Sequence, residues 1–288
     1  MKINGSTRVF FTVADPIAQV RAPEVFNLVF NRFDIDAVMV PLQVAPAQLE
    51  STIRALMAAP NAGGVSLSIP HKSVAAGFMD RCSDVASVAK AVNAIRPGKG
   101  GTLEGDLFDG RGLVNLLEHY HFPYVGKRAL LIGAGGAASA ITTMLAASDI
   151  GEIHIYDPDT AKSQSLAELI NTHFRVLARA IDSNDPAGFD LVINASPLGL
   201  KPNDPMPCDV DRLDEHTSVV DILMKNQPTP WLRAVKARGL KAQPGFDMLI
   251  LQTPLYLEFF GYPEAAEAIR RDDSALRELL IPPEMLDV

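Results

Sequence analysis

The sequence is poor in the residues on which several protein classes depend. Its 288 residues include 2 cysteines, Cys82 and Cys208, which are far apart and form no CxxC pair. They cannot supply the disulfide framework of a small secreted domain, so we interpret both as reduced packing residues of a cytoplasmic protein. No His/Cys cluster has the spacing of zinc ligands, and we expect no metal site.

Long apolar runs and an excess of basic residues are also missing. The first five residues (MKING) lack the apolar stretch of a signal peptide, and no run approaches the ~20 apolar residues needed to cross a bilayer. The 34 acidic and 26 basic residues give a formal net charge of -8, whereas nucleic-acid-binding proteins usually carry a basic face. We therefore expect neither a membrane nor a nucleic acid as a partner. A small anionic substrate remains compatible, because a few local cations can hold it.

The composition that remains is that of a globular protein, with 48% hydrophobic and 21% charged residues, and the length suffices for two domains. In the first third, short apolar runs predict strands at residues 8–13, 37–44 and 64–69. Helical patterns at residues 22–33, at residues 46–57 and after Pro70 separate and follow them. This alternation predicts a parallel sheet with helices on both faces.

A second alternating unit begins near Asp109. Strands are predicted at residues 127–133, 152–156, 176–180, 191–195 and 218–222, and helices at residues 137–147, 160–174 and 229–238. Residues 248–260 and 263–280 are helical in pattern but do not continue the rhythm, so we expect them to pack back on the first domain. The predicted domains are residues 1–109, completed by residues 246–288, and residues 110–245.

A glycine-rich turn follows the buried strand that opens the second unit. Its residues are Gly133, Ala134, Gly135, Gly136 and Ala137. Glycines there permit a tight turn and let backbone N–H groups approach a pyrophosphate at the positive end of a helix. Because the pattern departs from GxGxxG, a tight turn without a ligand is the alternative.

The next predicted strand ends at Asp157, about 20 residues further on, where dinucleotide-binding proteins place an acid. A carboxylate at this point can accept hydrogen bonds from both ribose hydroxyls of NAD, and it repels the 2′-phosphate of NADP. Asp157 could also cap the following helix, and the two roles are compatible. Lys162 is the only nearby cation that could rescue NADP binding. We therefore expect NAD as the preferred cofactor, with NADP possible.

Several segments, in order along nearly the whole chain, together resemble the shikimate dehydrogenase family. Residues 64–72 (GVSLSIPHK) resemble its strand ending in Thr/Ser-x-Pro-x-Lys, residues 90–94 (KAVNA) its GAVNT, residues 105–112 (GDLFDGRG) its GxNTDxxG, and residues 194–199 (NASPLG) its NATPxG. Its later pattern is matched by Thr229-Pro230 and by Gly245 to Leu249 followed by Gln252. Jointly these segments are far more specific than any one of them.

The resemblance implies a fold of an N-terminal α/β substrate domain completed by C-terminal helices, with a Rossmann-like dinucleotide-binding domain between. It implies an NAD(P)-dependent oxidoreductase that transfers a hydride reversibly between the nicotinamide and a ring secondary alcohol, shikimate or a relative. The partner would be a small cyclic polyol or hydroxy acid, the pathway aromatic amino acid biosynthesis, and the oligomeric state stays open. A quinate-type dehydrogenase and a ligand-binding regulatory protein without turnover are the alternatives.

The resemblance also assigns roles to single residues. Lys72 would be the acid/base group and Asp109 its partner; by themselves these would be a first-turn lysine and a helix cap. The assignment makes chemical sense, because oxidation of an alcohol requires a group that accepts its proton. The remaining positions implied are Ser68, Asn93 and Gln252 at the ring hydroxyls, and Ser196, Ile222, Gly245 and Met248 at the cofactor. Taken alone, Asn93 would be a turn residue and Gln252 a core amide.

The departures from the family concern the substrate. Residues 16–27 (PIAQVRAPEVFN) align with its PIxHSxSPxxHN, whose two serines bind the shikimate carboxylate, but Val20 and Ala22 stand there. Arg21 lies between them and points to the opposite face if the segment is extended, so we interpret it as a surface residue. Four further replacements make the expected pocket more apolar or change its polar groups: Ser66, Leu107, Phe108 and Met224. We expect shikimate to be a poor substrate.

Overall fold

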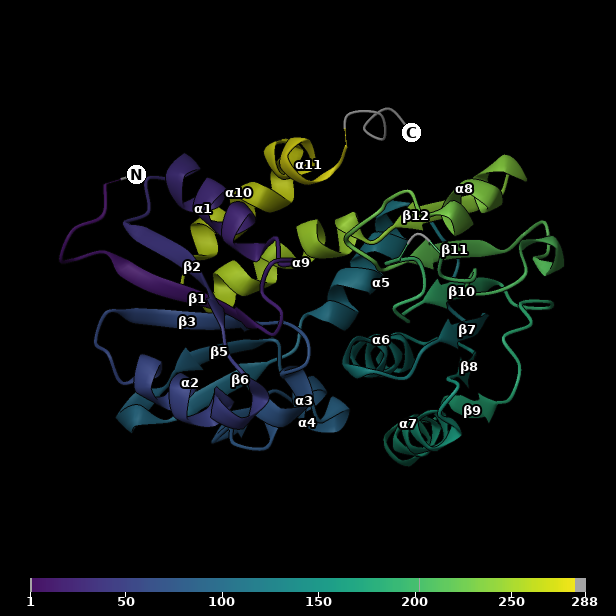
Figure 1. The fold of residues 1–288 in the computed structure, drawn as a ribbon, viewed down its shortest axis with the longest axis horizontal. Helices are drawn as coiled ribbons and strands as arrows, with labels where there is room; N and C mark the ends of the chain where they lie inside the picture. Colours follow the sequence, from purple (N-terminus) through teal and green to yellow (C-terminus); the bar gives the residue numbers. More distant parts are fainter. Residues whose placement is uncertain (1, 202, 283–288) are drawn as a thin grey trace. The chain divides into compact units, whose positions relative to one another are not determined.

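The computed structural model describes residues 2–201 and 203–282 and divides into two compact units (Figure 1). Unit 1 comprises Met1–Phe108 with Ile250–Val288, and unit 2 comprises Asp109–Leu249. Each unit contains a six-stranded sheet with helices packed against it. This is the α/β fold expected from the sequence.

The sheet of unit 1 is mixed. Its strands are β1 (Arg8–Ala14), β2 (Ala37–Gln43), β3 (Ala62–Leu67), β4 (Arg81–Cys82), β5 (Ala94–Pro97) and β6 (Leu103–Asp106), in the order β2-β1-β3-β5-β6-β4. The predicted strands β1, β2 and β3 pair in parallel. β5 runs antiparallel to both β3 and β6. For β5 and β6 the reason is their connection over residues 98–102, which is too short for the crossover that parallel strands need. The three predicted strands therefore form a parallel set, as expected, and the antiparallel pairings of β5, which was not predicted, make the sheet mixed.

The helices of unit 1 come from both ends of the chain. They are α1 (Ala22–Arg32), α2 (Leu49–Met57) after a short 3-10 turn, α3 (Lys72–Ala76), α4 (Asp84–Ala89), the end of α9 (Phe246–Phe259), α10 (Pro263–Arg271) and α11 (Ser274–Leu280). The Phe260 ring lies 4.9 Å from that of Phe10 on β1. The C-terminal helices therefore pack on the first sheet, as expected. The single helix predicted over residues 263–280 is two, interrupted at Asp272 and Asp273.

Unit 2 has an all-parallel sheet. Its elements are α5 (Asp109–His119), β7 (Arg128–Ile132), α6 (Gly136–Ala147), β8 (Glu152–Tyr156), α7 (Thr160–His173), β9 (Leu177–Ile181), β10 (Leu191–Asn194), β11 (Ser218–Asp221), α8 (Pro230–Ala237) and β12 (Lys241–Pro244). The strand order is β12-β11-β10-β7-β8-β9, which is that of a doubly wound dinucleotide-binding fold. The helices α6, α7 and α8 and two irregular segments connect these strands, because each parallel pair needs a crossover connection.

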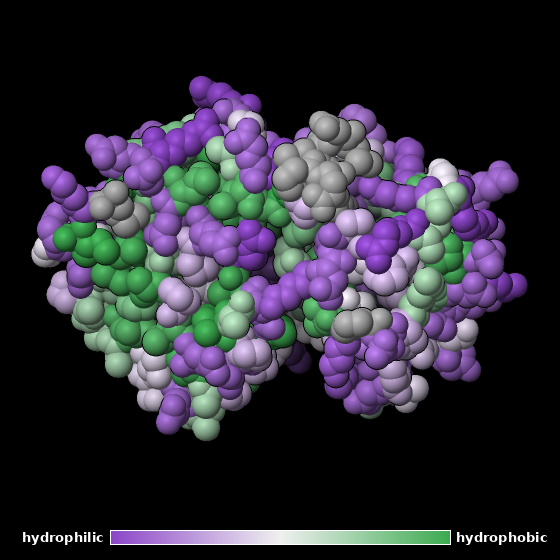
Figure 2. Space-filling view, turned by 45° about the horizontal axis from the view of Figure 1, so that its top comes forward, coloured by the Kyte–Doolittle hydropathy of each residue, from purple (hydrophilic) through white to green (hydrophobic). Residues whose placement is uncertain are grey.

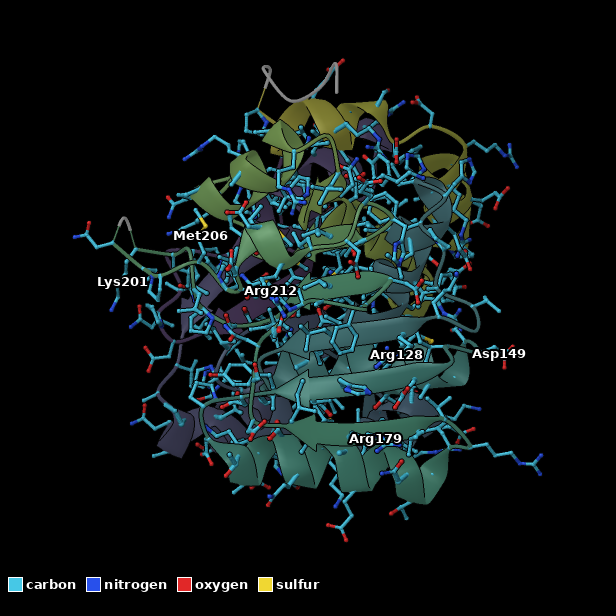
Figure 3. All side chains as sticks on the ribbon, turned by 90° about the vertical axis from the view of Figure 1, so that its right-hand side faces the viewer. Arg128, Asp149, Arg179, Lys201, Met206 and Arg212 are labelled. Carbon is cyan, nitrogen blue, oxygen red and sulfur yellow. The ribbon has the colours of Figure 1, made fainter. Side chains whose placement is uncertain are left out.

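One part of this sheet carries ion pairs between neighbouring strands. No helix occurs in residues 182–190, between β9 and β10. On the three strands β7, β8 and β9, Arg128 and Arg179 (Figure 3) both approach Glu152, with N–O distances of 3.4 Å and 3.1 Å. Elsewhere on the sheet, Trp231 and Leu232 of α8 pack in a buried cluster with Val192 and Val219.

The surfaces of the units differ in character. In the view of Figure 2, hydrophobic residues are more frequent on the face of unit 1, and polar residues dominate that of unit 2. Among the described residues, no helix has the length and apolar character needed to cross a membrane.

Candidate functional site

The residues predicted to bind a dinucleotide lie at one edge of the sheet of unit 2. Because its strands are parallel, their C-terminal ends meet at the same edge, where open α/β sheets bind ligands. β7, β8, β10, β11 and β12 lead there to Gly133, Asp157, Ser196, Ile222 and Gly245, respectively. The structure thus brings together residues that are more than a hundred positions apart in the sequence.

Two glycines of the turn after β7 are needed for different reasons. Gly133 has a φ of +107°, and a Cβ there would lie 2.7 Å from the Ala195 carbonyl oxygen. Gly135 has a φ of -84°, and a Cβ there would meet no atom within 4 Å. The fold therefore requires a glycine at position 133 but not at position 135. Gly135 stands directly before α6, which begins with Gly136 and Ala137, so the open space at Gly135 suits a ligand approaching the helix N-terminus.

The Asp157 carboxylate is held in place by backbone groups. Its Oδ2 accepts a hydrogen bond from Ala134 N at 2.8 Å, and its Oδ1 accepts one from Asp159 N at 2.9 Å. Each oxygen has a further lone pair for a hydroxyl donor. The N-cap residue of α7 is Asp159, so Asp157 is not the helix cap. The Lys162 ammonium group lies 3.4 Å from Asp159 Oδ2.

The other predicted cofactor residues of unit 2 are held by short side-chain and backbone contacts. Ser196 Oγ donates to Asn194 Oδ1 at 2.6 Å, and Ile222 N donates to Asn194 O at 3.1 Å. A Cβ at Gly245 would lie 2.7 Å from the Ile222 backbone, so these two segments touch. Met248 is buried and its N–H donates to Gly245 O at 3.1 Å.

In unit 1, the structure brings four predicted residues together around the end of β3. Ser68 follows β3, and after a short turn Lys72 begins α3. The Lys72 carbonyl accepts a hydrogen bond from Val92 N at 3.0 Å, so the start of α3 lies beside Asn93. The Asn93 amide donates to Gln252 Oε1 at 3.5 Å. Amides and hydroxyls in this arrangement can bind the hydroxyl groups of a polyol.

Tyr256 belongs to the same group and was not predicted. Its hydroxyl donates to the Asn93 carbonyl at 3.0 Å and lies 3.5 Å from Ser66 Oγ. Asn93 Oδ1 also accepts a hydrogen bond from Phe108 N at 2.9 Å. Tyr256 lies four residues after Gln252 on α9, so both occupy one face of the helix. That spacing is the one signal in the sequence, and it indicates only that the two residues share a helix face.

Val20 and Ala22 lie where the chain passes from β1 to α1. Asp15 N donates to Ile69 O at 3.1 Å, so this passage starts beside the turn that leads to Lys72. Val20 is half-buried and Ala22 is buried as the first residue of α1. Neither side chain offers a hydrogen-bond donor. The Arg21 guanidinium pairs with Glu24 at 2.8 Å and donates to Leu279 O at 3.1 Å.

Asp109 is buried and begins α5 at the first position of unit 2, whereas Lys72 lies in unit 1. Their partnership stays a prediction.

His71, directly before Lys72, is completely buried, and this burial lowers its pKa despite the opposing Asp15 carboxylate. A neutral imidazole there adds no second positive charge beside Lys72. No group of three or more His, Cys, Asp or Glu in residues 2–201 and 203–282 is arranged to hold a metal ion.

The known proteins to which this chain is similar include shikimate dehydrogenases. The family model described as "Shikimate dehydrogenase substrate binding domain" matches residues 12–95. A shikimate dehydrogenase (NADP(+)) of Desulforamulus reducens is 33% identical over 279 residues, covering 93% of this chain and 95% of the relative.

Solved structures match over similar lengths. Shikimate 5-dehydrogenase from Listeria monocytogenes, in complex with shikimate and NAD, has a TM-score of 0.84 at 26% identity and covers 94% of this chain and 98% of its own. The ligand-free 5-ketofructose reductase of Gluconobacter sp. strain CHM43 has a TM-score of 0.80 at 26% identity, covering 92% and 98%.

Proposed function

The chain belongs to the shikimate dehydrogenase family, and we propose that it catalyses reversible hydride transfer between a nicotinamide dinucleotide and a ring secondary alcohol. The observation that carries this proposal is the pairing, at one edge of the parallel sheet, of an open Gly135 with a backbone-anchored Asp157. Residues 110–245 form the cofactor domain in this proposal. Residues 1–109 with 246–288 form the substrate domain.

The residues present fit a dinucleotide. Gly135 is a glycine that the fold itself does not need, and it stands where a pyrophosphate would approach the start of α6. Asp157 keeps lone pairs for two ribose hydroxyls while its orientation is fixed by Ala134 and Asp159. Ile222, Gly245 and Met248 would border the nicotinamide ring, which supplies or accepts the hydride when bound.

Proton transfer is assigned to Lys72 and Asp109. As the hydride leaves the carbinol carbon, the hydroxyl proton passes to the Lys72 amine, and the reverse reaction returns it. Asp109 is assigned as the partner of Lys72 in this proton transfer. Ser68, Asn93 and Gln252 bind the neighbouring hydroxyl groups and so select the alcohol that faces Lys72.

For the cofactor, we propose a preference for NAD over NADP. Asp157 would meet the 2′-phosphate of NADP with like charge, and Lys162 is engaged by Asp159 at 3.4 Å. The relative from D. reducens is named an NADP(+) enzyme, so the proposal sets this chain apart from it at Asp157.

For the substrate, we propose an alcohol or ketone without a carboxylate near Val20 and Ala22. Neither side chain has a hydrogen-bond donor, and Arg21 is engaged by Glu24 and Leu279. A similar protein is named a 5-ketofructose reductase, and a ketofructose is a polyhydroxy ketone with no carboxylate. The ring alcohol that faces Lys72 and Asp109 is retained in this proposal.

A substrate panel tests the function. Shikimate, quinate, carboxylate-free cyclic polyols and ketoses are each offered with NAD and NADP, or their reduced forms, and turnover is followed at the nicotinamide absorbance. We expect turnover with at least one substrate, and none above background in the Lys72→Ala variant. A chain that binds these compounds but transfers no hydride with any pair would be a binding protein, and the proposal would be wrong.

A further inference from the structure

A buried carboxylate lies at the edge of the sheet of unit 2 where the dinucleotide is proposed to bind. It has no role in the proposed hydride and proton transfer. Asp221 is the last residue of β11 and has 0% exposure. Its Oδ1 accepts hydrogen bonds from Asn194 Nδ2 at 3.0 Å and from Leu223 N at 3.3 Å. Its Oδ2 accepts one from Thr229 Oγ1 at 2.8 Å. Three donors, one from the end of β10 and two from the segment after β11, therefore converge on one side chain.

The first of these donors belongs to the turn that carries Ser196. Asn194 is itself completely buried. Its Oδ1 accepts hydrogen bonds from Ser196 N at 3.1 Å and Ser196 Oγ at 2.6 Å, and its Nδ2 also donates to Leu198 O at 3.1 Å. The orientation of the Asn194 amide is thus fixed by Asp221 on one side, and it fixes Ser196 on the other.

The other two donors hold the segment that begins with Ile222. Leu223 N binds Asp221 directly, and Gln227 Nε2 closes the segment by donating to Leu223 O at 2.9 Å. Thr229 is the N-cap of α8, where its Oγ1 also accepts Leu232 N at 3.3 Å. Asp221 therefore ties both ends of the 222–229 segment to the end of β11.

A carboxylate is an expensive residue for this position. Burial raises the pKa of Asp221 to about 6, against the effect of its three donors, because a charge in a buried site loses its hydration. An apolar residue would avoid that cost but would leave three buried donors without an acceptor. What the carboxylate provides is acceptor capacity for several donors at once.

We propose that Asp221 is a positioning residue for the cofactor, which holds the Ser196 turn and the 222–229 segment in the conformation that receives the dinucleotide. The inference rests on the proposed function, since it concerns the same edge of the sheet. Asp221 acts through Asn194 and Leu223 and touches no ligand itself. Nothing in the family pattern described above assigns it a role.

The test compares three variants by the Kd for NAD, measured by titration calorimetry well below each variant's Tm. In Asp221→Ala the three donors lose their acceptor, and we expect NAD binding to weaken by at least about tenfold. Asp221→Asn keeps an oxygen for Asn194 and Leu223, and its amide can donate to Thr229 Oγ1, so we expect a Kd within about threefold of wild type. Val219→Ala is the matched control, since Val219 lies on the same strand, is fully buried and packs in the apolar cluster.

The control separates positioning from stability. Val219→Ala lowers the Tm through a core cavity but leaves the Asp221 hydrogen bonds in place, so its Kd for NAD should match that of wild type. Equal NAD binding by Asp221→Ala and wild type would overturn the inference, as would a loss shared by Val219→Ala. If wild type itself binds no nicotinamide dinucleotide, the proposed function fails instead, and the two failures are distinguishable.

Discussion

Gly133 and Gly135 lie two positions apart, and the fold makes opposite demands on them. An alanine at position 133 would face the backbone of Ala195 at a positive φ, whereas an alanine at position 135 would meet open space. We therefore expect Gly133→Ala to destabilise unit 2 strongly, by several kcal/mol, and Gly135→Ala to cost within about 1 kcal/mol. Only Gly135→Ala should yield a well-folded protein whose affinity for NAD has fallen by at least about tenfold, because its methyl group occupies the path of the pyrophosphate.

Thermal unfolding and NAD titration of the two variants check this. A Gly135→Ala variant with unchanged NAD affinity would mean that the space in front of α6 is not the pyrophosphate site. Gly133→Ala serves as the comparison in which stability, and not the ligand, is affected.

Lys72 and Asp109 carry the proposed proton transfer. Replacing either with alanine should lower kcat by about 10²–10⁴-fold, the range of general acid/base catalysis. NAD affinity should change little, because neither residue is among those proposed to bind the dinucleotide. Steady-state kinetics on the substrate identified by the panel, together with NAD titration, measure both quantities. Near wild-type kcat in both variants would refute the assignment.

Asp157 is expected to decide between the two nicotinamide cofactors. Wild type should show a kcat/KM for NAD at least about tenfold above that for NADP, because a repulsive carboxylate replaces a charge-assisted contact worth ~1.5–3 kcal/mol. The Asp157→Ser variant should lose part of the NAD activity, and its kcat/KM for NAD should exceed that for NADP by a smaller factor than in wild type. Comparable kcat/KM values with both cofactors in wild type would contradict this, and Lys162→Ala would then show whether that lysine supports NADP.

At the residue scale, the sequence reveals the residues that stand in recognisable motifs. Gly133, Asp157 and Asn93 are predictable because the chemistry of a turn, a strand end or a family segment singles them out. Asp221 and Tyr256 are not, because one is an ordinary acid at the end of a strand and the other an aromatic residue in an apolar helix. Their roles depend on which donors the tertiary fold places around them, and a single sequence does not contain that information.

Among the secondary-structure elements, the predictable ones have a strong pattern of their own. β7 is a continuous apolar run followed by a glycine-rich turn, and α1 repeats apolar residues at helical spacing. β5, β6 and β12 are short and contain Arg, Pro, Glu, Lys or Gln. They are strands because neighbouring strands supply hydrogen-bond partners, and residue propensity plays little part. This explains why the antiparallel pairing in unit 1 could not be predicted.

The longer edge strand of each sheet, β2 in unit 1 and β9 in unit 2, is bound by an asparagine side chain in the same way. On β2, Met39 N donates to Asn27 Oδ1 at 2.8 Å, and Asn27 Nδ2 donates to Met39 O at 2.8 Å. On β9, Ala178 N donates to Asn171 Oδ1 at 2.9 Å, and Asn171 Nδ2 donates to Ala178 O at 2.8 Å. In each unit an asparagine from a helix thus occupies both outward-facing backbone groups of an edge residue. Such groups would otherwise be available to a strand of another chain.

Asn171→Ala should therefore promote association between copies of the chain through β9. The variant exposes the N–H and C=O of Ala178, and we expect a concentration-dependent increase in mass over wild type in size-exclusion chromatography with light scattering. Asn171→Ala/Ala178→Pro should revert to the wild-type mass, because proline removes the N–H and is tolerated on an edge strand. Identical masses for Asn171→Ala and wild type over about a hundredfold range of concentration would show that this asparagine does not protect the edge.

The sequence indicates that one domain is inserted into the other more clearly than it indicates the residues at which each domain ends. The change of rhythm near Asp109 and the return of non-alternating helices after residue 245 indicate a domain inserted into another. The division at Phe108 and Leu249 lies close to these points. The exact limits depend on long helices such as α9, whose pattern continues from one unit into the other.

Charge at the scale of the molecule bears on the choice of substrate. With a formal net charge of -8, the protein repels an anion at long range, and only local donors can hold a carboxylate. Val20 and Ala22 offer none, and hydrogen bonds to a charged group contribute about 1.5–3 kcal/mol each. Two missing hydroxyls correspond to a naive loss of roughly 3–6 kcal/mol, part of which water can restore. We expect shikimate to bind at least about a hundredfold more weakly than it would to a site with two serines.

The double variant Val20→Ser/Ala22→Ser tests this, with Val20→Ala as a control that makes space without adding a donor. The serines should lower the KM for shikimate by at least about tenfold, and they should leave the KM of an analogue with a hydroxymethyl group in place of the carboxylate nearly unchanged. Val20→Ala should improve neither KM.

Raising the ionic strength should lower the wild-type KM for shikimate but not that for the neutral analogue, because salt screens long-range repulsion. A micromolar KM for shikimate in wild type, unimproved by the serines, would mean that other residues hold the carboxylate, and that Val20 and Ala22 do not exclude it.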